Sequence, residues 1–71
     1  MDVKSEIYAV VSKVQVSPGA DVAADDLLMI LESMKMEVPV TAPAAGRVRS
    51  IVVAEGASVE EDDLLLVLDL D

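Results

Sequence analysis

The chain has 71 residues, a length that allows one small domain whose hydrophobic core is only just sufficient for folding. Its 14 acidic residues outnumber 5 basic ones, and the formal net charge of −9 argues against binding to nucleic acid or to an anionic membrane surface. Cysteine and histidine are both absent, so the sequence offers no disulfide, no thiolate metal site and no histidine base.

The N-terminus does not resemble a signal peptide, because residues 1–6 lack a basic segment followed by an apolar one. No apolar stretch approaches the roughly 18 residues that a membrane-spanning helix requires. We therefore expect one cytoplasmic domain over residues 1–71, with neither a membrane nor a nucleic acid among its partners. Its acidic surface would suit partners with basic docking surfaces, where charge speeds the encounter.

The first half of the chain predicts short strands. Val14-Gln15-Val16 is a β-branched run that a turn at Gly19 closes, and Leu27–Leu31 is an apolar run of strand length. A helix over residues 20–37 remains an alternative, because Ala, Leu, Met, Glu and Lys all favour helix. The matching segment Val59–Leu70 lacks the same polar face, which favours the strands.

The second half repeats the first without a gap, at the offset of 37 residues that separates Gly19 from Gly56. Asp25-Asp26-Leu27-Leu28 recurs as Asp62-Asp63-Leu64-Leu65. A solenoid needs about three repeats, so two copies predict one closed unit of interlocked halves. The strand spacing predicts an all-β sandwich or flattened barrel, with the halves related by a pseudo-twofold.

The lysine in Glu32-Ser33-Met34-Lys35-Met36-Glu37 has no counterpart in the repeat, because the offset carries Lys35 past the last residue, Asp71. Under the pseudo-twofold this lysine would project from the end furthest from the termini. On a strand, Met34 and Met36 would share one face opposite Lys35. At a hairpin tip both methionines would be exposed, which core packing does not explain.

Charged groups around this lysine have simple interpretations. Glu32 and Glu37 would face each other across the hairpin, which is unfavourable for two like charges. A lysine amine is protonated and poorly nucleophilic at neutral pH, and the chain has no base to activate it, so an external ligase would have to acylate it. The acidic clusters at residues 25–26 and 60–63 lack calcium-loop spacing and predict solvated turns, with no metal site.

The run Glu32–Glu37, followed by Val40-Thr41-Ala42-Pro43-Ala44-Ala45-Gly46-Arg47-Val48, resembles the attachment signature of the biotinyl/lipoyl domain family, and of its biotin carboxyl carriers in particular. The resemblance extends from about Glu6 to Leu70. It implies a flattened barrel-sandwich of two four-stranded antiparallel sheets, with biotin joined covalently to Lys35 at a hairpin tip.

The resemblance also implies the roles of the neighbouring residues. Met34, Met36, Glu32 and Ser33 would flank the biotinylated Lys35 for recognition by biotin protein ligase. The domain would have no catalytic residues of its own. It would serve as the carrier subunit of a biotin-dependent carboxylase, of the acetyl-CoA or propionyl-CoA type, although the sequence does not name the acceptor. Biotin would shuttle carboxylate between biotin carboxylase and carboxyltransferase sites, and the domain itself is expected to be monomeric.

The chain departs from this family in three places. Ser5–Val11 stands where many members have Ala-Pro and a Gly before Val, Asp25 and Asp62 replace glycines, and no segment has the length of the "thumb" of some bacterial carriers. Two alternatives stay open. One is a lipoyl carrier, although such members usually lack methionine on both sides of the lysine. The other is a biotinylated orphan or regulatory interaction module.

Overall fold

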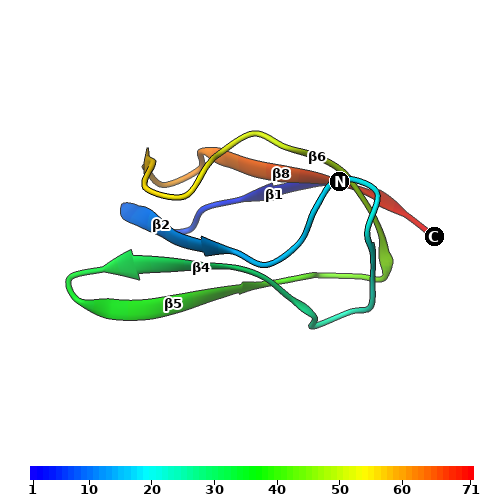
Figure 1. Cartoon of the computed structure of the whole chain (residues 1–71), viewed down its shortest axis with the longest axis horizontal. Coiled ribbons are helices and arrows are strands. Elements are labelled where there is room, and N and C mark those ends of the chain that lie inside the picture. Colours follow the sequence, from blue (N-terminus) through cyan, green and yellow to red (C-terminus); the bar gives the residue numbers. More distant parts are fainter.

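The computed structural model describes residues 1–71 as two four-stranded antiparallel sheets packed face to face (Figure 1). The first sheet has the order β1-β8-β6-β3, with β1 at Asp2–Lys4, β8 at Leu64–Leu70, β6 at Gly46–Ile51 and β3 at Asp21–Val22. The second has the order β5-β4-β2-β7, with β5 at Met36–Thr41, β4 at Leu27–Ser33, β2 at Ala9–Val14 and β7 at Ser58–Val59. The predicted sandwich is confirmed, and its sheets remain separate instead of closing into a barrel.

Two details of the sequence prediction are corrected. The helical alternative for residues 20–37 is wrong, because this segment forms β3, β4 and the start of β5. Of the run Val14–Val16 and its repeat Ile51–Val53, only the first residue of each belongs to a strand: Val14 ends β2, which begins at Ala9, and Ile51 ends β6, which begins at Gly46. Burial alternates along the first part of these strands, and both end where the chain bends into the following turn. No segment is a helix long and apolar enough to cross a membrane.

The predicted pseudo-twofold relates the two sheets strand by strand. At the offset of the repeat, β2 corresponds to β6, β3 to β7 and β4 to β8, and the strand orders of the two sheets match. The turns match as well: φ is 91° at Gly19 and 90° at Gly56, and 70° at Asp25 and 72° at Asp62. The aspartates that replace glycines therefore hold left-handed turns, which Asp tolerates better than most residues.

Each half is tied to the other by backbone hydrogen bonds. The Gly19 amide donates to the Val48 carbonyl at 2.7 Å, and the matching Gly56 amide donates to the Val11 carbonyl at 2.8 Å. The turn of one repeat thus satisfies a strand of the other, and the halves are interlocked as predicted.

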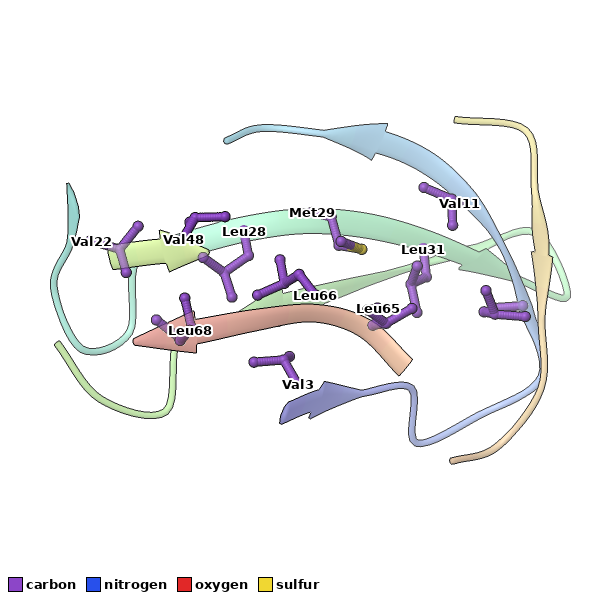
Figure 2. Close-up of a cluster of buried hydrophobic side chains, with 13 residues drawn as sticks. Val3, Val11, Val22, Leu28, Met29, Leu31, Val48, Leu65, Leu66 and Leu68 are labelled. Carbon is purple, nitrogen blue, oxygen red and sulfur yellow. The ribbon is translucent and has the colours of Figure 1, made fainter. Parts of the chain in front are cut away.

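The core lies between the sheets and is almost wholly aliphatic (Figure 2). Matched positions of the repeat supply it in pairs. Leu28 and Leu65 are both 0% exposed, and Met29 packs at the position that Leu66 fills in the other half. Both leucines lie in the apolar runs that the repeat places at matched positions. Fully burying such a side chain contributes about 1.5–3 kcal/mol, so β4 and β8 anchor the fold.

The acidic clusters are turn residues, as predicted. The Ala23 amide donates to a carboxylate oxygen of Asp26 at 2.9 Å, and the Glu60 amide donates to Asp63 at 2.8 Å. These carboxylates cap the turns that lead into β4 and β8. No group of three acidic side chains comes together in a way that could hold a metal ion.

Candidate functional site

The candidate site is the turn of the β4–β5 hairpin. Pairing runs as far as Ser33 opposite Met36, which leaves Met34 and Lys35 as a two-residue connection. Their φ angles of 53° and 66° are both in the left-handed region, as a type I′ turn requires. This turn matches the right-handed twist of the flanking strands, so it continues the hairpin to its tip.

The methionines are exposed, but not in the arrangement that strand alternation predicts. Met34 is 92% exposed and Met36 is 68% exposed, in agreement with the prediction. Met34 belongs to the turn, however, so the expectation that it shares a strand face with Met36 opposite Lys35 is wrong. The left-handed turn breaks the two-residue alternation on which that expectation depended.

The amine of Lys35 is exposed and has no ionic partner. The two ion pairs of the structure lie on the first sheet, between Arg47 and Asp21 at 3.0 Å and between Arg49 and Asp69 at 3.7 Å. There the hydrogen bond from Arg47 to Asp21, together with the charge of Asp21, raises the pKa of Arg47. A surface lysine without such a partner is accessible to an enzyme that acylates it.

Glu32 and Glu37 occupy directly opposed positions on β4 and β5, as predicted. Both are exposed, and neither forms an ion pair. Like charges in this arrangement destabilise a hairpin. The two carboxylates place negative charge at the base of the tip, close in sequence to the positive charge of Lys35. Ser33 lies between Glu32 and the turn and is half-buried.

The tip stands at one end of an elongated molecule. The chain measures 34 × 18 × 18 Å along its principal axes. In Figure 1 the β4–β5 turn lies at the left extreme of the long axis, whereas both termini lie toward the right. The prediction that the lysine projects from the end furthest from the termini is confirmed.

The site is a projection and not a cleft. The structure has one cavity, of about 310 Å³, which opens between β1 and β5. None of residues 32–37 lines this cavity, although Ile7, Val38 and Pro39 do. The lysine therefore lies outside the one cavity of the structure, on an exposed turn.

Sequence reasoning missed one feature of this end of the molecule. The connection between β1 and β2 passes beside the hairpin and exposes Ile7 and Tyr8, at 39% and 63%. The sequence does carry a signal for this feature. At the repeat offset Ile7 and Tyr8 match Ala44 and Ala45, so one half has two large side chains where the other has two small ones.

Comparison with known proteins identifies the family. Residues 2–68 match the family model described as Biotin-requiring enzyme, which covers biotin and lipoyl attachment domains. The chain belongs to this biotin–lipoyl family.

Relatives within the biotin–lipoyl family agree with this assignment. The chain is 50% identical over 50 residues to the "Biotinylated protein TB7.3 homolog" of Mycobacterium leprae, an alignment that covers 70% of each chain. It is also similar to part of a single-chain, multi-domain long-chain acyl-CoA carboxylase, with 32% identity and a TM-score of 0.95. That match covers 100% of this chain but only 7% of the carboxylase.

A lipoyl member is similar in fold as well. The lipoyl domain of the 2-oxoglutarate dehydrogenase complex of Azotobacter vinelandii shares 29% identity with a TM-score of 0.84, over 97% of this chain and 95% of that one. The fold alone therefore does not separate the two cofactors of the biotin–lipoyl family. The cofactor therefore has to be assigned from the residues around the hairpin tip.

Proposed function

We propose that this protein is a biotin carboxyl carrier, with biotin joined by an amide to Lys35. In this role it shuttles carboxylate between the biotin carboxylase and carboxyltransferase sites of a biotin-dependent carboxylase. The observation that carries the proposal is the exposed, unpaired Lys35 at a left-handed hairpin tip, with exposed methionines on both sides. The biotinylated relative and the similar carboxylase segment support it.

Loading Lys35 requires an enzyme other than this chain. No histidine or cysteine is available, and none of residues 32–37 lines the cavity. Biotin protein ligase supplies an activated biotinyl group and removes a proton from the amine, whose nitrogen forms the amide as the activating group leaves. Lys35 loses its positive charge in this step. Exposed Met34 and Met36, with Glu32 and Ser33, are the contacts we assign to ligase recognition.

The domain positions the cofactor and performs no chemistry on it. Biotin supplies the atom that carries the carboxylate, which no side chain here can replace. The hairpin holds Lys35 clear of the rest of the surface, so the tethered group can enter an active site that the domain itself cannot enter. Tethering raises the concentration of the group at both sites it can reach.

The remaining parts of the proposal follow from this role. The partners are biotin protein ligase, a biotin carboxylase and a carboxyltransferase, and an acceptor of the acetyl-CoA or propionyl-CoA type is the first to test. Residues 1–71 act as one monomeric, non-catalytic attachment domain in the cytoplasm.

The test is transfer of biotin in vitro. Purified chain is incubated with biotin protein ligase, biotin and ATP, and incorporation is followed by avidin binding. The wild type and the Lys13→Arg control are expected to be labelled, while Lys35→Arg is not, because it keeps the charge without an acylatable amine. Labelling of Lys35→Arg, or no labelling of the wild type, would overturn the proposal.

A further inference from the structure

The one cavity of the structure lies between the edge strands β1 and β5, and the internal repeat predicts how it is lined. The two strands correspond to each other at the repeat offset, so a groove between them lies on the pseudo-twofold and is expected to have matched pairs of residues along it. Most of the lining follows this rule, in the pairs Asp2 with Pro39, Val3 with Val40, Lys4 with Thr41 and Glu6 with Pro43.

The rest of the lining breaks this symmetry, and all of it lies on the side of Lys35. Ile7, Leu31 and Val38 line the cavity, whereas their counterparts at the repeat offset do not. Leu31 pairs with Val38 within the lysine hairpin, and the β1–β2 connection that carries Ile7 lies toward the same end of the molecule as the hairpin turn (Figure 1). The cavity is therefore extended toward the lysine and not toward the termini.

The cavity combines an apolar part with a polar rim. Val3 and Leu31 are buried, and Val38 and Val40 are half-buried. The rim has exposed side chains of both charges and a hydroxyl, from Asp2, Lys4, Glu6 and Thr41. No side-chain hydrogen bond or ion pair of the structure uses these four groups. An occupant with an apolar body, and with both donors and acceptors along one edge, fits this lining.

The size and the edges of the cavity favour a small molecule over a strand of another protein. Its volume of about 310 Å³ is at the lower end of the range of about 300–1,000 Å³ for small-molecule sites. β1 has only three residues, and Pro39 within β5 has no N–H with which to pair an added strand. Biotin has the chemistry that the lining fits, because its sulfur-containing ring is apolar and its ureido ring has a carbonyl acceptor between two N–H donors.

The cavity begins within reach of a group attached to Lys35. Val38 comes three residues after Lys35, a distance of roughly 10 Å along an extended chain at about 3.3 Å per residue. A biotinyl-lysine arm has bonds of about 1.5 Å and extends about 14 Å from the Cα to the rings. The arm is therefore long enough to fold back along β5 and to bring the rings to Val38 and Val40.

We propose that this cavity is a resting site for the biotin on Lys35, an inference that rests on the proposed function. Ile7, Val38 and Val40 contact the apolar ring, and Lys4 and Thr41 on the rim donate to the ureido carbonyl. The site removes apolar surface of the cofactor from water between visits to the enzymes. An enzyme that binds only the released arm then meets a carrier whose apparent affinity is reduced by the resting fraction.

NMR spectra of the full chain, recorded before and after the ligase attaches biotin, test the resting site directly. Attachment is expected to shift the amide signals of residues 3–7 and of Val38, Val40 and Thr41, in addition to those of the turn. Nuclear Overhauser effects are expected between biotin protons and the methyl groups of Ile7 and Val38. Intact mass measured on the same samples shows that biotin is attached.

A substitution within the extended part of the cavity gives a matched comparison. Ile7→Ala places here the residue that Ala44 supplies at the other end, and Ile7 is outside the core, so the fold is expected to be kept. Most of the amide shifts in β1 and β5 are expected to be lost in this variant. Val52→Ala, at an exposed aliphatic residue outside the cavity, is the control and is expected to keep them.

The rate of capture by avidin is a second readout that involves no carboxylase. Because avidin takes the released arm, biotinylated wild type is expected to be captured about threefold more slowly than biotinylated Ile7→Ala, and at the same rate as Val52→Ala. Amide shifts confined to residues 33–36, or equal capture rates for wild type and Ile7→Ala, would overturn the resting site and leave the carrier role intact. A wild-type chain that gains no biotinyl mass would overturn the proposed function, and the resting site with it.

Discussion

Met34 and Lys35 occupy a backbone conformation that L-amino acids avoid, and this is the unusual feature of the tip at the residue scale. A left-handed residue costs about 1–2 kcal/mol unless it is Gly, Asn or Asp. Asn-Gly is the pair that type I′ turns favour. The β4–β5 ladder offsets the cost. Under the proposed function, Met and Lys are kept at this strained position for recognition and attachment, because they do not favour the turn.

Relieving this cost gives a first prediction. Met34→Asn is expected to raise the free energy of unfolding by about 0.5–1 kcal/mol, because Asn tolerates the left-handed turn. Urea denaturation followed by circular dichroism measures the change. Met36→Asn is the control, since Met36 lies on a strand, where Asn is disfavoured. Equal stabilisation by both changes would contradict the strained turn.

The contrast between an exposed methionine, Met36, and a buried one, Met29, gives a second prediction. Met36→Ala is expected to change stability by no more than about 0.5 kcal/mol, because the side chain is exposed, while transfer of biotin to Lys35 slows. Met29→Ala, the same change at a fully buried position, is expected to cost about 2–5 kcal/mol. Guanidinium titrations of the two variants compare them. Similar losses would mean that Met36 packs in the core.

At the scale of elements, sequence reasoning succeeded where the repeat gave each signal twice. The apolar runs that became β4 and β8, and the turns at Gly19 and Gly56, are legible in both halves. It failed where the signal is short or chemically unusual. β3 and β7 have two residues each, which is too few for any periodicity. Met34 carries no turn preference, so its place in the turn was not predictable from its type.

Gly46 gives the prediction that belongs to this scale. It opens β6 between β3 and β8, and an added Cβ would meet the Asp69 carbonyl oxygen and lie 3.1 Å from the Leu70 Cα. These are backbone atoms, which cannot move aside as a flexible side chain could. Gly46→Ala is therefore expected to lower the free energy of unfolding by about 1–3 kcal/mol. Its repeat counterpart is Ala9, whose Cβ is accommodated, so the closeness is a property of one sheet only.

Thermal unfolding measures the loss of stability in Gly46→Ala, and an assay with biotin protein ligase measures the loading of Lys35 in the same variant. Gly46→Ala is expected to unfold at a lower temperature yet accept biotin normally below that temperature, since β6 lies in the sheet that does not contain the hairpin. If Gly46→Ala were as stable as the wild type, β6 and β8 could move apart there without a loss of stability, and the prediction would be wrong.

For the whole molecule, the interlocked halves predict that neither half folds alone. Each half leaves its turn amides without acceptors when the other is removed. A fragment of residues 38–71 is expected to show no cooperative unfolding transition by circular dichroism. In the intact chain Leu65→Ala is expected to cost about 2–5 kcal/mol, a large part of the roughly 5–15 kcal/mol typical of a domain. Leu70→Ala, at a half-exposed position, is the control, and cooperative folding of the fragment would contradict the interlocked core.

The central claim is that this fold presents Lys35 for biotinylation, and the most direct test is the mass of the natively expressed protein. Intact mass spectrometry is expected to show the chain plus one biotinyl group, biotin less water, and peptide mapping is expected to place it on Lys35. The Lys35→Arg variant is expected to have its unmodified mass. A lipoyl mass, an unmodified wild-type chain, or biotin on Lys4 or Lys13 would contradict the account.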